Sequence, residues 1–123
     1  MRQVAPAEVP PPAGIYSPGI VQGGFLFCAG QGPFDAEGNR VGETFAEQVR
    51  ITMRNLEAVA AAAGTSLSRT VRMGVFLNDI EDFAEMNSVV AEFLTEPYPA
   101  RTTVQVPLKG FDVEIDAIIA LED

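Results

Sequence analysis

The sequence predicts a single α+β domain, in which two amphipathic helices cover one face of a sheet of about four to six strands. The chain of 123 residues has the length of one domain. Its β-prone runs and helical segments follow the order β-β-α-β-α-β-β, and no internal repeat indicates a second unit. Two helices can cover only one face of such a sheet, so the other face is either exposed or buried by a partner.

The chain begins with a proline-rich lead, residues 1–13, and an expected hairpin follows it. The lead has neither the basic region nor the apolar region of a signal peptide. Two short β-prone runs then occupy residues 15–22 and 25–31. Gly23 and Gly24 separate the two runs, and because glycine readily adopts positive φ, this pair favours a tight hairpin turn.

Residues 44–64 have the strongest helical pattern in the chain. Thr44 and Glu47 have the spacing of a capping box, and Gly64 stands where the helix is expected to end. The apolar positions recur with the helical period and form one inward face: Phe45, Val49, Met53, Leu56, Ala60 and Ala63. The segment therefore predicts a long helix packed on the sheet.

A strand, a second helix and two more strands complete the predicted order. Residues 70–77 form a strand whose end is expected to face core on both sides, and residues 82–94 form the second amphipathic helix. Its cap candidates are Asn78 and Asp79, and its expected inward residues are Phe83, Met86, Val90, Phe93 and Leu94. The prolines of "PYP" stop this helix. Strands are expected at residues 101–106 and 112–121.

The last strand indicates which face of the sheet is left open. One face carries the inward residues Val113, Ile115, Ala117, Ile119 and Leu121. Glu114 and Asp116 share the other face, and Ile118 and Ala120 add apolar side chains to it. That free face is a candidate oligomer interface, and a cleft between subunits is a natural place for a ligand site.

Composition excludes several classes of function. The formal net charge of −9 argues against a general nucleic-acid partner, because such binding depends on neutralising phosphates. The chain has no histidine, which removes the usual general base, the usual zinc ligand and the common nucleophilic pairs. No apolar run approaches the roughly eighteen residues of a membrane span. The single cysteine, Cys28, cannot form an intrachain disulfide, and a cytoplasmic protein is expected.

Two residues are the leading candidates for chemistry. Arg101 follows a stiff Pro-Ala pair at the start of a strand, and its planar guanidinium can hold a carboxylate through two parallel hydrogen bonds. The ordinary alternative is an edge-strand arginine that discourages aggregation. Glu114 stands among apolar strand residues, so partial burial would raise its pKa towards acid–base work. Its ordinary alternative is a solvated carboxylate.

Other positions have both a functional and a structural interpretation. Tyr16 is expected to open the first strand, where its ring either walls a pocket or is an ordinary amphipathic side chain. Gly30 and Gly32 in "CAGQGP" allow backbone amides to approach a ligand, or serve as turn residues. Asn87 lies near the inward face of the second helix, where it bonds either a neighbouring loop or local backbone.

The motifs taken together resemble the reactive-intermediate deaminase family, also called the Rid or YjgF family. The resemblance runs through "GIYSPGI", "FCAGQGP", "EQVRITMRNLEAVAAAAG", "VRMGVFLNDIEDFAEMN", "YPARTTVQV" and "VEIDAIIA". It implies a chorismate-mutase-like α+β fold with a mixed sheet, assembled as a homotrimer whose sheets face a central barrel and whose three clefts lie between subunits. It also implies hydrolysis of imines such as 2-iminobutanoate and 2-iminopropanoate to 2-keto acids and ammonia, without a cofactor or metal.

The same resemblance assigns roles to individual positions. Arg101 matches the family's carboxylate-clamping arginine, and Glu114 matches the glutamate that positions water for attack on the imine carbon. Tyr16 matches the aromatic residue beside the pocket, and Asn87 matches an asparagine of the second helix near it.

Several positions match or depart from the family's site in ways that concern its substrate range. Gly30 and Gln31 match its "SGQ" segment, but Ala29 replaces the serine and removes a hydroxyl. Thr103 stands where many members have cysteine or another small residue, and the segment 107–112 is shorter than usual. Two alternatives remain beside the deaminase: a non-catalytic ligand-binding or regulatory trimer, and a ribonuclease or translation inhibitor, which the charge of −9 disfavours.

Overall fold

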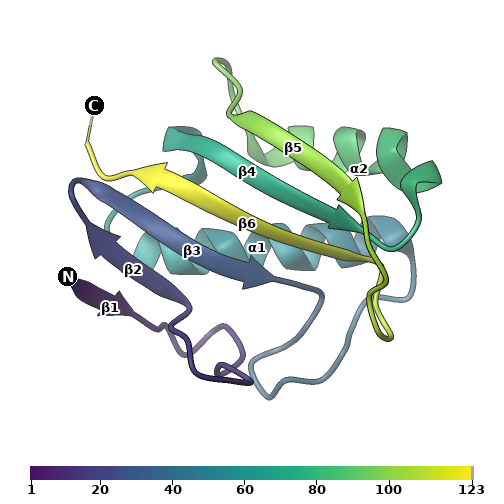
Figure 1. The fold of residues 1–123 in the computed structure, drawn as a ribbon, viewed down its shortest axis with the longest axis horizontal. Helices are drawn as coiled ribbons and strands as arrows, with labels where there is room; N and C mark the ends of the chain where they lie inside the picture. The colour runs from purple at the N-terminus through teal and green to yellow at the C-terminus, as the bar shows by residue number, and fades with distance from the viewer. Residues whose placement is uncertain (123) are drawn as a thin grey trace.

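The computed structural model describes residues 1–122 and places two helices on one face of a six-stranded sheet (Figure 1). The strands are β1 (Arg2–Val4), β2 (Gly19–Gln22), β3 (Phe25–Gln31), β4 (Thr70–Leu77), β5 (Ala100–Gln105) and β6 (Val113–Ala120). The helices are α1 (Phe45–Ala62) and α2 (Phe83–Val90), with 3-10 turns at Leu67–Arg69, Ile80–Asp82 and Ala91–Phe93. The sheet order is β1-β2-β3-β6-β4-β5, in which only β4 and β5 are parallel. The predicted α+β class and the mixed sheet are confirmed.

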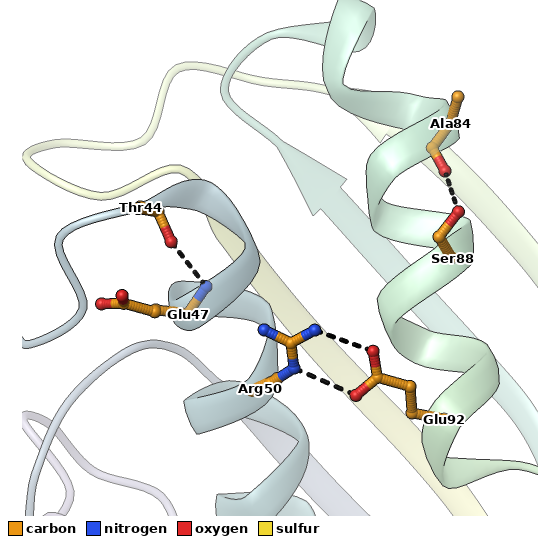
Figure 2. A network of polar contacts seen from close by, with 6 residues as sticks. All are labelled: Thr44, Glu47, Arg50, Ala84, Ser88 and Glu92. Atoms are coloured by element: carbon orange, nitrogen blue, oxygen red, sulfur yellow. Dashed lines mark hydrogen bonds and ion pairs between the residues drawn. The ribbon is translucent and has the colours of Figure 1, made fainter.

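Local sequence signals account for the hairpin and for the ends of α1. Gly23 and Gly24 have φ of 63° and 84°, as the hairpin prediction requires. The hydroxyl of Thr44 accepts a hydrogen bond from the amide of Glu47 at 3.1 Å (Figure 2). The Glu47 carboxylate accepts from the amide of Glu43 at 2.9 Å, so the return bond of the capping box is displaced by one residue. Gly64 has φ of 83° just beyond the helix end.

The core lies between the sheet and the two helices. Its fully buried side chains include Leu26, Val49, Met53, Leu56, Val59, Met73, Val75, Leu77, Met86, Val113, Ile115 and Ile119. On the outer surface Arg50 of α1 and Glu92 beside α2 form a two-pronged ion pair, with N···O distances of 3.0 and 2.8 Å (Figure 2). This pair joins the two helices across their exposed side, where water and salt screen an ion pair and its contribution to stability is small.

The first part of the chain differs from the sequence analysis. Residues Arg2–Val4 form an edge strand that was not predicted, and Val4 and Val9 are buried in the core. The second strand begins at Gly19 and not at residue 15, so Tyr16 precedes the strand that it was expected to open. Pro18 explains the late start, because proline has no amide hydrogen for the ladder.

The second helix also differs from its prediction. α2 ends at Val90, and a 3-10 turn replaces its predicted last residues. Asp79 caps the 3-10 turn ahead of the helix by accepting from the amide of Glu81 at 2.9 Å. Phe83 was expected to face inward but is 38% exposed, because the first turn of α2 lies at the rim of the core beside the edge strand β5.

The face of the sheet opposite the helices is open and largely apolar. Phe25 and Phe27 of β3 and Val104 of β5 are exposed on it, and Ile118 of β6 is half-buried between them. Near the end of β4, Val75 and Leu77 are buried under the helices and Phe76 is half-buried on the open side. No helix in residues 1–122 has the length and apolarity that crossing a membrane requires.

Candidate functional site

Arg101 is a half-buried cation on the edge strand β5. Its guanidinium carbon lies 5.3 Å from the ring centroid of Phe83, and its Nη1 lies 3.9 Å from the sulfur of Met86. No carboxylate of residues 1–122 comes within 4.0 Å of it. Burial lowers the pKa of Arg101, but an arginine starts so high that it stays charged. The fold therefore presents a positive charge that forms no ion pair with any side chain of residues 1–122.

Arg101 lies at the wall of a hollow of about 460 Å³, which we call the Arg101 hollow. Its lining is mostly apolar, with polar groups on Arg101, Asn87 and Tyr98: Met73, Asn87, Val90, Ala91, Leu94, Tyr98, Pro99 and Arg101. Pro99 fixes one backbone torsion two residues before the arginine, so the approach to the charge is stiff. The hollow can therefore accept a small anion with an apolar side chain.

Glu114 is a half-buried carboxylate near the start of β6, on the open face of the sheet. Its side-chain carboxylate has no hydrogen bond or ion pair with residues 1–122. Burial, and to a smaller extent the nearby Asp116, raises the pKa of Glu114 above the ordinary glutamate range. A Cβ atom on Gly30 would stand 2.5 Å from Oε2 of Glu114, so any other residue there would force the carboxylate to shift from this position.

The carboxylate borders a second hollow of about 230 Å³, the Glu114 hollow. Its lining is Pro10, Pro11, Ala13, Tyr16, Pro18, Gly30, Gln31, Gly32, Phe34, Gly38 and Glu114. The proline-rich lead thus supplies one wall. The Tyr16 hydroxyl accepts a hydrogen bond from the amide of Ala13 at 3.3 Å, which folds the tyrosine back onto that lead. The lead was not predicted to take part in a site. Val9, an apolar residue just before its three prolines, is buried and anchors the segment.

The two hollows lie on opposite faces of the sheet. Arg101 is paired with Met73 in the β4–β5 ladder, and Met73 is buried under the helices. Glu114 is paired with Phe76 in the β4–β6 ladder. Because side chains alternate along a strand, positions 73 and 76 point to opposite faces, and so do their partners. Within one chain, therefore, Arg101 and Glu114 cannot contact the same small molecule.

The predicted site residues divide between these places. Tyr16, Gly30 and Gln31 lie with Glu114, and Asn87 lies with Arg101. Ala29 and Thr103 line neither hollow. Their positions are explained by the sheet: the amide of Ala29 donates to the carbonyl of Pro18 at 3.0 Å, and the buried Thr103 hydroxyl has no hydrogen-bond partner among the described residues.

The remaining reactive groups are bound into the structure. Cys28 is buried, and burial together with Asp116 raises the pKa of its thiol to about 12, which makes it a poor nucleophile. Asp116 accepts a hydrogen bond from the amide of Gly74 at 2.9 Å. Among residues 1–122, no three His, Cys, Asp or Glu side chains gather as metal ligands would. Arg101 and Glu114, by contrast, form no ion pair with any side chain of residues 1–122.

Comparison with known proteins gives consistent matches over nearly the whole chain. A family model described as Endoribonuclease L-PSP matches residues 7–121. The mitochondrial protein mmf2 of Schizosaccharomyces pombe is 46% identical over 112 residues, which cover 87% of this chain and 88% of mmf2. TdcF of Escherichia coli, named as a candidate reactive intermediate deaminase, is 34% identical over 96% of each chain.

Solved structures show the same similarity in three dimensions. RidA from the Antarctic bacterium Psychrobacter superimposes with a TM-score of 0.91 at 36% identity, covering 98% of this chain and 99% of RidA. E. coli TdcF, solved with bound serine, superimposes with a TM-score of 0.89 at 31% identity, covering 98% of each chain.

Proposed function

The chain belongs to the endoribonuclease L-PSP family, also called the Rid or YjgF family, whose members include reactive intermediate deaminases. We propose that it hydrolyses 2-imino acids. The substrates are 2-iminobutanoate, 2-iminopropanoate and their enamine tautomers, and the products are 2-keto acids and ammonia. The observation that carries the proposal is the charge of Arg101, which no carboxylate of residues 1–122 pairs with, in a mostly apolar hollow. A small monocarboxylate supplies the missing anion and fits the apolar lining.

Arg101 binds the substrate carboxylate in this proposal. The guanidinium fork matches the two oxygens of a carboxylate, and two parallel charge-assisted bonds fix the orientation of the attached imine carbon. Phe83 lies under one face of the guanidinium and so limits the directions in which it can turn. Orientation matters because an iminium carbon is already electrophilic, so a placed water suffices for attack.

In the proposed mechanism, Glu114 transfers a proton from the attacking water to the nitrogen of the leaving amine. Its carboxylate takes a proton from water as the water oxygen bonds to the iminium carbon, and the C=N π pair moves to nitrogen. The protonated Glu114 then returns that proton to the amine nitrogen of the carbinolamine. The C–N bond breaks, ammonia leaves, and the hydroxyl proton goes to solvent as the ketone forms. A raised pKa suits both steps, because the group must accept and then donate near neutral pH.

The reaction needs both hollows, so a second copy of the chain is part of the proposal. We propose a homotrimer in which the Arg101 hollow of one subunit meets the Glu114 hollow of the next. Two observations support it: the two hollows lie on opposite faces of the sheet, and the open face carries exposed Phe25, Phe27 and Val104. The number three comes from the family resemblance. A cytoplasmic location stays a prediction, since the relative mmf2 is named as mitochondrial.

A second candidate is ligand binding without turnover. TdcF was solved with bound serine, an amino acid whose carboxylate could occupy an arginine clamp. In that case Arg101 would sense an amino or keto acid, and Glu114 would hold its amino group. Ribonuclease activity has less support despite the family's description, because the chain combines a charge of −9 with the absence of histidine.

One assay separates turnover from binding. A threonine dehydratase releases 2-iminobutanoate, and semicarbazide traps the imine as a semicarbazone. If the protein hydrolyses the imine, adding it lowers the rate of semicarbazone formation in proportion to its concentration. An unchanged rate, together with saturable binding of 2-ketobutanoate, would favour the binding module.

A further inference from the structure

Two chain segments flank Glu114, and both are held from α1 on the other side of the sheet. One segment is the end of β3 with the turn that follows it: Gly30 of the strand packs against the carboxylate, and Phe34 of the turn lines the hollow. The other is Asp112, directly before β6 and two residues ahead of Glu114. The placement of the carboxylate therefore depends on how these two segments are fixed.

Asn55 fixes the first segment. Its side-chain amide donates to the carbonyl of Gly32 at 3.1 Å and to the carbonyl of Phe34 at 2.9 Å. The side chain is 8% exposed, so these two bonds offset the cost of burying a polar group at the edge of an apolar core. One amide on α1 thus holds two carbonyls of the turn that borders the Glu114 hollow.

Gln48 fixes the second segment. Its side-chain nitrogen donates to Oδ2 of Asp112 at 3.2 Å, and its side-chain oxygen accepts from the amide of Asp112 at 2.9 Å. Gln48 is 2% exposed and lies seven residues before Asn55, so the two amides project from the same side of the helix two turns apart. Between them, Thr52 is also buried, but its hydroxyl donates only to the carbonyl of Gln48 within α1.

We propose that Gln48 and Asn55 are positioning residues for the proposed reaction, which hold the Glu114 carboxylate where it can take the proton from water. The kinetic part of this proposal rests on the proposed function. Neither amide lines a hollow, so neither contacts substrate. The carboxylate-binding group, Arg101, lies in the other hollow, so loss of either amide acts on proton transfer and leaves substrate binding in place.

The test uses substitutions that keep volume and remove hydrogen bonds. Asn55→Leu and Gln48→Met remove the two tethers, and Thr52→Val is the matched control on the same helix face. We expect kcat for 2-iminobutanoate to fall about ten- to a hundredfold in the first two variants, the range typical of small misplacements of a catalytic group. KM should stay within about twofold of wild type, and Thr52→Val should keep wild-type kcat at a similar melting temperature.

A second readout does not need activity. Carbon-13 NMR of the glutamate carboxyls gives the pKa of Glu114, whose charged neighbour is Asp116. If the tethers hold Glu114 in its partly buried position, that pKa should fall towards the ordinary glutamate value in Asn55→Leu and Gln48→Met, and not in Thr52→Val. If the wild-type protein hydrolyses no imine, the proposed function fails, and the NMR titration still decides the positioning role.

Three results would overturn the inference. One is that Asn55→Leu and Gln48→Met fold, keep kcat within about twofold of wild type and leave the pKa of Glu114 unchanged. Another is an equal loss of kcat in Thr52→Val. The third is that both tether variants fail to fold while Thr52→Val folds, because the amides would then serve stability alone.

Discussion

Replacing Arg101 by lysine separates the geometry of the guanidinium from its charge. Lysine keeps the positive charge but presents a single ammonium, which cannot form two parallel bonds with one carboxylate. A hydrogen bond to a charged group contributes about 1.5–3 kcal/mol. That range corresponds to about a ten- to a hundredfold loss of kcat/KM. Arg101→Lys should therefore lose nearly as much kcat/KM as Arg101→Ala.

The structure also predicts what these changes do to stability. Arg101 has no carboxylate within 4.0 Å among residues 1–122, so no ion pair is lost. Its contact with Phe83 at 5.3 Å is a cation–π interaction at a half-exposed site, worth about 0.5–1 kcal/mol. Melting of both variants should therefore stay within a few degrees of wild type, which leaves activity as the main readout.

The assay is competition with semicarbazide for 2-iminobutanoate, with Arg54→Ala as the control. Arg54 is an exposed arginine of α1 outside both hollows, so its loss should leave kcat/KM unchanged. Wild-type kcat/KM in Arg101→Ala would refute the clamp and return Arg101 to the role of an edge-strand gatekeeper. Wild-type kcat/KM in Arg101→Lys alone would show that charge suffices and that two-pronged geometry does not matter.

Changes around Glu114 and on the open face extend the test. Glu114→Gln should lower kcat about a hundredfold or more, because an amide cannot take the proton, while calorimetry should still detect 2-ketobutanoate binding; loss of both would make Glu114 a binding residue. Activity should rise with pH through a midpoint above the ordinary glutamate pKa, and Asp116→Asn should lower that midpoint in a pH–rate profile. Because the pKa of Glu114 is higher in the folded than in the unfolded state, its contribution to stability is lost as pH rises above the unfolded-state pKa. Glu114→Gln should therefore have a higher melting temperature than wild type at neutral pH. Equal melting temperatures would show that the charged Glu114 does not destabilise the fold. Gly30→Ala should lower kcat, because its Cβ would stand 2.5 Å from the Glu114 carboxylate, whereas Gly14→Ala, whose nearest contacts lie at 3.8 Å, should not. Phe27→Asp should give monomers in light scattering and abolish turnover, and active monomers would exclude a site shared between subunits.

The elements with strong local signals were predictable from the sequence. The run 25–31, the run 70–77 and the Gly23-Gly24 turn coincide with β3, β4 and their hairpin, because alternation and positive-φ glycines act over a few residues. Thr44 and Gly64 bracket α1 for the same reason. β1 was missed because its three residues carry no pattern of their own and are held by pairing with β2.

The separation of the candidate site into two hollows could not be predicted from the sequence. Arg101 and Glu114 are close in sequence, and which face each occupies depends on the ladders that β5 and β6 form with β4. Those pairings join segments that are far apart in the chain, and no local period encodes them. The amides of Gln48 and Asn55 did leave a signal, since two polar residues seven apart interrupt the apolar side of a helix.

The net negative charge of the chain does not oppose binding of the substrate carboxylate by Arg101, because substrate and product differ in net charge. A 2-imino acid in its iminium form carries one positive and one negative charge, so the field of a protein with net charge −9 exerts little net force on it. The 2-keto acid product is a net anion, and it is repelled once it leaves the immediate reach of Arg101. Repulsion of this kind extends over about 8 Å at physiological ionic strength, which exceeds the size of a 2-keto acid of four carbons. In the proposed reaction, therefore, one half-buried arginine captures a zwitterion with no net charge, and the net negative charge of the chain favours departure of the anion.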